Sequence, residues 1–188
     1  MPEDTIRTFV ACEVPQPVRA AVDRAVAPIR PDASVGWTKP PGWHLTLKFL
    51  GDLSTGDVKR VAQAAQEISG DLAPLHVRLG TWGAFPNPKR PRVLWLGVEE
   101  GADELTTAAR LLDRRLGELG FARETRAFHP HLTLARVRSP REGVRAWQAL
   151  QGTNERFEPF TADRMVVFQS VLARDGARYT PLAECFFG

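Results

Sequence analysis

The spacing of apolar residues predicts a strand followed by a helix at the start of the chain. Residues 5–14 are the first candidate strand, which ends at Pro15. Pro15 and Pro17 then favour the first turn of a helix. The apolar positions that follow recur at helical spacing and end before Pro31. They are Val18, Val22, Ala25, Val26 and Ile29.

A second strand and a second helix follow in the same order. The segment 34–39 is short, and an alternating strand then runs from His44 to Leu50. Residues 54–57 read Ser-Thr-Gly-Asp, which is the pattern of a capping box, and they predict a helix that ends at Gly70.

The rest of the chain continues with an alternating strand at 75–85 and a proline-rich loop at 86–91. The elements expected after this loop are a strand at 92–99, a helix at 102–119 that Gly120 stops, a strand that carries His131, a helix near 140–150, and strands near 157–172 and 177–187.

Two long segments share one pattern, which predicts an internal duplication. Trp95 stands 86 positions after Phe9, and His131 stands 87 positions after His44. Only two copies with so long a period indicate two similar lobes and not a solenoid.

The repeats predict one bilobal domain over residues 1–188, with copies at about 5–86 and 91–187. Its fold class is expected to be α+β, with two pseudo-symmetric lobes that each carry an antiparallel sheet and helices on the outer face. The inner faces of the two sheets would then line a cleft.

Composition and charge indicate the cellular environment of the protein but not the reaction that it catalyses. The formal charge is +3 and the sequence pI is about 9.2, a balance that tolerates a polyanion without requiring one. Cys12 and Cys185 lie in apolar segments without a metal-ligand spacing, so we expect reduced, buried thiols. No apolar run is long enough to span a membrane, and the first residues lack the pattern of a signal peptide. We therefore expect a cytoplasmic protein.

The four residues His-Leu-Thr-Leu occur at 44–47 and again at 131–134. Side chains on a strand alternate with period two, so the histidine and the threonine of each motif share a face. One such triplet is common by chance, and a lone half-buried histidine is usually structural. Two copies at equivalent places in the repeats favour a single functional site to which both lobes contribute.

Two imidazoles that face each other across a cleft can act as general acid and general base. The pKa of histidine allows one ring to be protonated while the other is neutral. A threonine hydroxyl on the same face can donate a hydrogen bond to a substrate oxygen. The expected substrate is compact and anionic, with attacking and leaving oxygens on opposite sides, as in the in-line displacement of a phosphodiester.

A metal site is the alternative that the histidines leave open. His129 and His131, together with His44, could supply three nitrogen ligands to zinc. No acidic residue stands at a metal-ligand spacing from them, however. We therefore favour a site without metal and a supporting or surface role for His129. His76 has no partner threonine and is expected to be structural.

The chain resembles the two-histidine (2H) phosphoesterase superfamily, which carries paired His-x-Thr-x motifs on two pseudo-symmetric lobes. It is most similar to the RNA 2′,3′-cyclic phosphodiesterases, the LigT-like or 2′-5′ RNA ligase branch. Three segments carry the resemblance: IRTFVACEVP at 6–15, WHLTLKFLG at 43–51 and FHPHLTLAR at 128–136.

The resemblance implies hydrolysis of RNA or nucleotide 2′,3′-cyclic phosphate to a 2′-phosphate without metal, with reversible 2′-5′ RNA ligation in some members. His44 matches the proton donor to the leaving 3′ oxygen, and His131 matches the proton acceptor that activates water. Thr46 and Thr133 match the threonines that bind the phosphate. Arg136 matches a basic position expected to contact the nucleotide phosphate. Strict alternation puts Arg136 on the opposite face of the strand, so a bulge would have to turn it inward.

Four further residues are candidates for substrate binding. Lys48 alternates onto the face of the first His-x-Thr motif and could contact the anion, with a surface role as the alternative. Phe9 and the pair Trp37 and Trp43 could stack on a nucleobase. Packing is the more common role of such aromatic side chains.

These features predict a monomeric enzyme that needs no cofactor and acts, away from membranes, on RNA ends or nucleotides bearing a 2′,3′-cyclic phosphate. Two alternatives remain open. The chain could be a non-catalytic module that binds RNA ends, although binding alone requires no matched acid and base. It could also be a cyclic phosphodiesterase for a small metabolite such as ADP-ribose cyclic phosphate.

Overall fold

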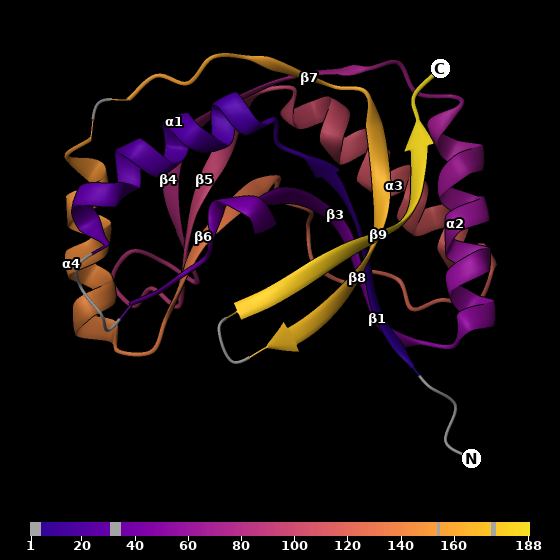
Figure 1. Ribbon diagram of the computed structural model, residues 1–188, viewed down its shortest axis with the longest axis horizontal. Coiled ribbons are helices and arrows are strands. Elements are labelled where there is room, and N and C mark those ends of the chain that lie inside the picture. Colours follow the sequence, from indigo (N-terminus) through magenta and orange to yellow (C-terminus); the bar gives the residue numbers. More distant parts are fainter. Residues whose placement is uncertain (1–4, 31–34, 154, 174–175) are drawn as a thin grey trace.

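The computed structural model describes residues 5–30, 35–153, 155–173 and 176–188 (Figure 1). Strands and helices alternate along the chain, as the apolar spacing predicts. The strands are β1 (Ile6–Glu13), β2 (Val35–Trp37), β3 (His44–Leu53), β4 (Leu75–Phe85), β5 (Val93–Glu100), β6 (His131–Val137), β7 (Phe160–Ala162), β8 (Arg164–Ala173) and β9 (Gly176–Phe186). The helices are α1 (Gln16–Val26), α2 (Thr55–Ser69), α3 (Ala102–Glu118) and α4 (Pro140–Gln151), with short 3-10 helices η1 (Ala27–Ile29) and η2 (Pro40–Gly42).

The helices begin and end close to the predicted positions because their caps are local. The side chain of Ser54 accepts a hydrogen bond from the backbone N–H of Asp57 at 3.1 Å, so the predicted cap of α2 is confirmed. Pro15 precedes α1, and a proline stands in its first turn. Gly120 follows α3 with a φ of 89°, a conformation that favours glycine.

The strands form one curled antiparallel sheet in the order β7-β4-β5-β6-β3-β1-β8-β9, with β2 paired to β6. At its centre, β3 pairs with β6 through Leu45 and Leu132. Outward from this pair, β1 lies beside β3 as β5 lies beside β6. The predicted α+β fold with two similar lobes is therefore confirmed.

Each lobe takes strands from both halves of the chain. β4 belongs to the first half of the chain but pairs with β5 of the second half. β8 belongs to the second half but pairs with β1 of the first half. The lobes are therefore not the consecutive ranges 5–86 and 91–187, and a duplication of the chain itself stays a prediction.

The single strand predicted near 157–172 is wrong. Asp163 divides this region into β7, which pairs with β4, and β8, which pairs with β1. One residue thus joins a strand at one end of the sheet to a strand near its other end. The sheet must curl for both pairings to form, and this curl brings the two lobes around a common cleft.

Helices cover the outer side of the curled sheet. Figure 1 shows α1 and α4 over the half that holds β4, β5 and β6, while α2 and α3 lie beside the other half. α3 contacts β3, α2 contacts β8 and β9, and α4 contacts β4 and β6. Within the described ranges, no helix is both long and apolar enough to cross a membrane.

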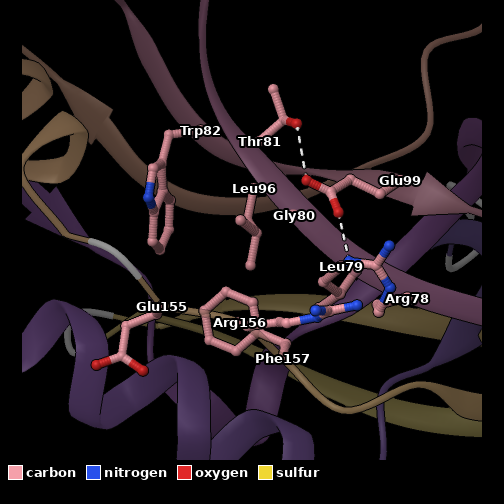
Figure 2. Close-up of a pocket in the computed structure, with 10 residues that line it drawn as sticks. All are labelled: Arg78, Leu79, Gly80, Thr81, Trp82, Leu96, Glu99, Glu155, Arg156 and Phe157. Carbon is pink, nitrogen blue, oxygen red and sulfur yellow. Dashed lines mark hydrogen bonds and ion pairs between the residues drawn. The ribbon is translucent and has the colours of Figure 1, made fainter.

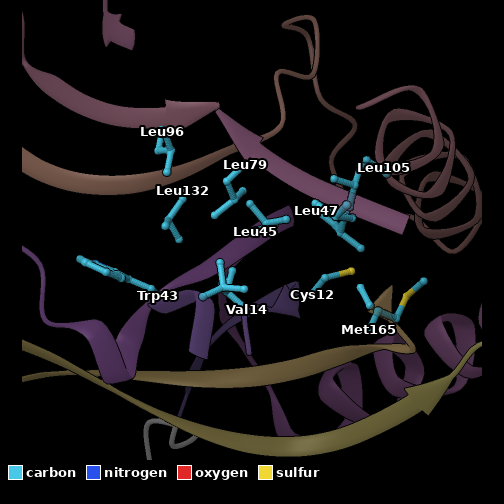
Figure 3. Packing of buried hydrophobic residues seen from close by; sticks show 14 of the residues in the cluster. Cys12, Val14, Trp43, Leu45, Leu47, Leu79, Leu96, Leu105, Leu132 and Met165 are labelled. Carbon is cyan, nitrogen blue, oxygen red and sulfur yellow. The ribbon is translucent and has the colours of Figure 1, made fainter. Parts of the chain in front are cut away.

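The apolar core lies between the sheet and these helices and runs through both lobes. Leu45 of β3, Leu132 of β6 and Leu96 of β5 meet there (Figure 3). Cys12 and Cys185 are free and buried, as predicted, and burial raises the pKa of the Cys12 thiol to about 12. The core therefore holds the central strands in a fixed register, with their opposite face toward the cleft.

Candidate active site

Both His-Leu-Thr-Leu motifs lie on the central strands β3 and β6. Leu45 and Leu132 stand opposite each other and are 1% and 0% exposed, because both side chains point into the core. The histidine and the threonine of each motif flank its leucine, so they point to the other face of the sheet. The structure thus brings the four predicted residues to one face at the junction of the lobes.

The two histidines are held by matching hydrogen bonds. Nδ1 of His44 donates to the carbonyl of Gly42 at 2.8 Å, and Nδ1 of His131 donates to the carbonyl of His129 at 2.7 Å. A carbonyl can only accept, so Nδ1 carries a hydrogen in both rings. Nε2 is then the atom left to accept or donate a proton. His129 takes part through its backbone carbonyl.

Burial lowers the pKa of His44 to about 4, an effect that the bond to Gly42 opposes and the charge of His131 adds to. Burial also lowers the pKa of His131. The hydrogen bond to the His129 carbonyl raises this pKa, and the positive charges of His129 and Arg136 lower it further. The charge of His131 therefore acts on His44. Both are neutral at pH 7 in the free protein.

A bulge in β6 turns Arg136 toward the cleft. Trp95 pairs with Thr133 and Leu94 pairs with Ala135, which leaves Leu134 as the extra residue. Beyond the bulge the alternation reverses, so Ala135 is buried and Arg136 lines a cavity with His44 and Thr133. The bulge that an inward Arg136 requires is present.

The equivalent bulge in β3 turns Lys48 away from the cleft. Ala11 pairs with Thr46 and Val10 pairs with Lys48, so Leu47 is the extra residue. The predicted face of Lys48 is therefore wrong, because strict alternation does not hold across the bulge. Phe49, the position that corresponds to Arg136, points into the cleft in its place and is 45% exposed.

Lys48 is buried and forms an ion pair with a half-buried aspartate. Its Nζ donates to Oδ1 of Asp113 on α3 at 2.7 Å and to the carbonyl of Ala122 at 2.8 Å. Asp113 also accepts hydrogen bonds from Arg123 and from the backbone N–H of Glu124. The ammonium group is thus bonded to Asp113 and to the Ala122 carbonyl, and it does not point toward a phosphate in the central cavity as predicted.

Phe9 supports His44 instead of presenting a free face. Its ring is 3% exposed and stacks on His44 at 4.7 Å and on Phe168 at 5.2 Å, measured between ring centroids. Trp95, its counterpart in the second lobe, lies 5.9 Å from His131 by the same measure. Phe9 lines the central cavity, but its ring leaves little surface for a nucleobase, so the structure favours the packing alternative for this residue.

The two tryptophans predicted as a pair have different environments. Trp43 is 2% exposed, and its Nε1 donates to Oγ1 of Thr38 at 2.7 Å, so it belongs to the core and not to a stacking platform. Trp37 is half-buried and lines a cavity with Arg136 and Arg138. Its Nε1 has no hydrogen-bond partner among the described residues. Trp37 therefore stays a candidate.

Three adjoining cavities surround the motifs. The central cavity, about 200 Å³, is lined by His44, Thr46, Thr133 and Arg136. The basic cavity, about 820 Å³, shares Arg136 with it and includes residues of β2, β6 and β9. The third, about 640 Å³, lies on the His131 side and shares Thr46 with the central cavity. We call it the His131 cavity.

Tyr179 is a site residue that the sequence reasoning missed. It lies on β9 and lines both the central and the basic cavity. The edge of its ring meets Phe9 and His44, each at 5.1 Å between centroids. Burial raises the pKa of its hydroxyl, and the charge of Arg136 lowers it. Its being the only tyrosine in the chain was the one available signal.

Two other features lie outside the site. His76 is exposed on β4 beside Thr161 of β7 and lines none of the three cavities. A polar cavity of about 350 Å³ lies at the bulge of β4 (Figure 2). There Arg78 is paired with Glu99 and Glu100, so its charge is already used within the protein.

The three-histidine metal alternative lacks the required cluster. In the part of the chain that the structure describes, no group of three or more His, Cys, Asp or Glu side chains is placed to hold a metal ion. His44, His129 and His131 therefore do not form the nitrogen site that their spacing left open.

Comparisons with known proteins find relatives that align with almost the whole chain. A relative from Aquifex aeolicus named RNA 2′,3′-cyclic phosphodiesterase is 29% identical and aligns over 97% of this chain and 98% of its own. A relative of the same name from Archaeoglobus fulgidus is 32% identical, and the alignment covers 94% of this chain and 98% of that relative. The crystal structure of E. coli LigT complexed with 3′-AMP has a TM-score of 0.79 at 25% identity, covering 97% of this chain and 98% of that one.

The family model described as the 2′-5′ RNA ligase superfamily matches residues 14–173, a range that holds both His-x-Thr motifs. Because this match extends over most of the chain, the chain belongs to the 2′-5′ RNA ligase superfamily.

Proposed function

We propose that this chain hydrolyses the 2′,3′-cyclic phosphate of RNA ends or nucleotides to a 2′-phosphate without a metal ion. The observation that carries the proposal is the pair of matching Nδ1 hydrogen bonds, which leave Nε2 of both His44 and His131 for proton transfer. Two such rings supply both the acid and the base that a phosphodiester displacement needs.

The reaction follows from these roles. Nε2 of His131 removes a proton from water as the water oxygen bonds to phosphorus. The bound phosphate anion raises the pKa of His44, so that this ring takes up a proton at Nε2. The bond from phosphorus to the 3′ oxygen breaks, and Nε2 of the protonated His44 gives its proton to that oxygen. The 2′ ester bond remains, so the product is a 2′-phosphate. The assignment of His44 as acid and His131 as base rests on the family resemblance, because the two rings have similar surroundings.

Charged and hydroxyl groups around the rings would hold the phosphate. Thr46 and Thr133 line the central cavity on the same face as the rings, and the guanidinium of Arg136 adds a positive charge beside them. These groups can hold the charge that develops on the non-bridging oxygens.

The basic cavity supports RNA over a small metabolite as the substrate. Arg136 and Arg138 line it together with the half-buried ring of Trp37, and it adjoins the central cavity. Cationic and aromatic side chains are the groups that hold single-stranded RNA. A chain of nucleotides upstream of the cyclic phosphate would occupy this cavity.

Phosphorus NMR of the products from a nucleoside 2′,3′-cyclic phosphate, with and without EDTA, tests the proposal. A 2′-phosphate formed at an unchanged rate in EDTA is expected, and a 3′-phosphate or no turnover would contradict it. RNA binding without turnover would favour the non-catalytic module. Faster turnover of a mononucleotide than of an oligonucleotide would favour a small metabolite. The monomeric state and the cytoplasmic location stay predictions.

A further inference from the structure

A cluster of four rings lies around His44, with one ring from each of β3, β1, β8 and β9. The Phe9 ring stacks on His44 and on Phe168, at 4.7 and 5.2 Å between centroids. Tyr179 completes the cluster from the edge strand β9 and meets His44 and Phe9 edge to face, with 89° and 79° between the ring planes. Aromatic pairs favour both of these geometries. The His44 imidazole is therefore held from two directions, by Phe9 and by Tyr179.

Tyr179 also packs against the backbone that orients His44. The Gly42 carbonyl accepts the hydrogen bond from Nδ1 of His44 at 2.8 Å. A Cβ on Gly42 would lie 2.9 Å from Cε2 of Tyr179, so the ring lies this close because residue 42 is a glycine. One side chain thus contacts both the imidazole and the residue whose carbonyl fixes its tautomer.

The contact with Tyr179 distinguishes His44 from His131, although the hydrogen bonds of the two rings match. β9 is the outermost strand on the His44 side of the sheet, and β7 is the outermost strand on the other side. β7 pairs with residues 75–77 at the start of β4, whereas the ring that meets His131 is Phe85 at the end of β4. Among the described residues, an outermost strand therefore supplies a ring to His44 and not to His131.

We propose that Tyr179 is a positioning residue for the acid of the reaction: its ring holds the His44 imidazole with Nε2 toward the phosphate in the central cavity. This inference rests on the proposed function. The hydroxyl of Tyr179 forms no hydrogen bond with any residue that the structure describes, so the ring is the part that acts on His44. Proton transfer depends steeply on the position of the acid. A displaced imidazole should therefore lower kcat more than it raises KM.

Three substitutions on β9 test the proposal by steady-state kinetics on a nucleoside 2′,3′-cyclic phosphate. Tyr179→Phe keeps the ring and should keep kcat within about twofold of the wild type. Tyr179→Ala removes the ring and should lower kcat about ten- to a hundredfold, while KM changes by less than about threefold. The matched control is Phe186→Ala, which removes an exposed ring of the same strand outside the three cavities and should change neither constant.

The pKa of His44, measured by proton NMR, is a readout that a loss of stability alone does not move. Its NMR signal is identified by its loss in His44→Ala. Burial is the main reason why this pKa lies at about 4, and Tyr179 supplies part of the cover. The pKa should therefore rise toward its ordinary value of 6.5 in Tyr179→Ala and stay near 4 in Tyr179→Phe and Phe186→Ala.

The charged and titratable side chains around His44 are Arg7 and Glu13 on β1, His131 and Arg136 on β6, and Tyr179 on β9. All of them except Tyr179 are the same in every variant, so a changed pKa of His44 reports the change at Tyr179.

The possible outcomes separate the two proposals. An unchanged kcat and an unchanged pKa of His44 in Tyr179→Ala would overturn the positioning role and leave the hydrolase intact. An equal loss of kcat in Tyr179→Phe would also overturn it, because the hydroxyl and not the ring would then carry the effect. Absence of hydrolysis by the wild type would overturn the proposed function and the role of Tyr179 in proton transfer with it. Thermal unfolding reports whether each variant is folded, and Tyr179→Leu, which keeps a larger apolar side chain, takes the place of Tyr179→Ala if that variant unfolds.

Discussion

His44 and His131 are oriented by the same device: each ring donates from Nδ1 to the carbonyl two residues before it, at 2.8 and 2.7 Å. The backbone thus fixes the tautomer of both rings. The two motifs are therefore alike in their chemistry as well as in their sequence.

Removal of either ring should abolish proton transfer without unfolding the protein. We expect His44→Ala and His131→Ala each to lower kcat by about 10² to 10⁴. The control is His76→Ala, because His76 is exposed on β4. Cyclic phosphate hydrolysis and thermal unfolding, measured on all three variants, check this. Near-normal activity in either active-site variant would exclude the paired mechanism.

The fall of kcat/KM with rising pH should begin at an unusually acidic pH. Turnover needs one protonated ring, and the free protein has a pKa of about 4 at His44 and a pKa below 6.5 at His131. Above the higher of these two pKa values both rings lose their protons, so kcat/KM should fall with rising pH from below pH 6.5. A bound phosphate anion raises both pKa values, so the alkaline limb of kcat should lie at higher pH. An alkaline limb of kcat/KM above pH 6.5 would contradict the pKa values of the free protein.

A substitution at Gly83 of β4 tests whether the Trp95 ring holds His131 in position. A Cβ at this position would come within 2.0 Å of the Trp95 ring, and Trp95 lies against His129 and His131. Gly83→Ala should therefore displace the tryptophan, destabilise the fold by about 1 to 3 kcal/mol and lower kcat between about ten- and a hundredfold.

The matched control for this change is Gly56→Ala in α2, where the nearest atom to a new Cβ is the Ser54 hydroxyl at 3.7 Å. It should leave activity unchanged and should not lower stability. Equal effects of the two substitutions in denaturation and turnover assays would show that Trp95 does not support His131.

The parts of the fold that the sequence predicts are those with local causes. The helix at 55–69 follows from its Ser54 cap and its apolar spacing, and the strand from His44 follows from alternation. The division of 157–172 into β7 and β8 has no local signal, because the partners β4 and β1 decide where each strand ends.

The sequence predicts which side chains face the site only where side chains alternate strictly between the two faces of a strand. His44 and Thr46 precede the bulge at Leu47, so their shared face is correct, whereas Lys48 follows it and its face is wrong. The inward turn of Arg136 follows only from the family resemblance and not from the alternation along the strand. Bulges depend on cross-strand pairing, which a single sequence does not reveal.

The ion pair between the buried Lys48 and the half-buried Asp113 should contribute to stability, because it joins β3, α3 and the segment after α3. Burial alone would raise the pKa of Asp113, but hydrogen bonds from Lys48, Glu124 and Arg123 together lower it, so the carboxylate is charged at pH 7. Lys48→Met leaves this charge in a site that is 13% exposed. We expect a loss of up to about 3 kcal/mol in the free energy of unfolding, since two of its partners remain.

The double variant Lys48→Met with Asp113→Leu should recover part of this loss, because no unpaired charge is then buried. Urea denaturation of the wild type, both single variants and the double variant gives the coupling energy between the two side chains. A coupling near zero would mean that the pair does not anchor the segment after α3. The control pair is Arg60 with Asp57 on the exposed face of α2, for which we expect a coupling below about 0.5 kcal/mol.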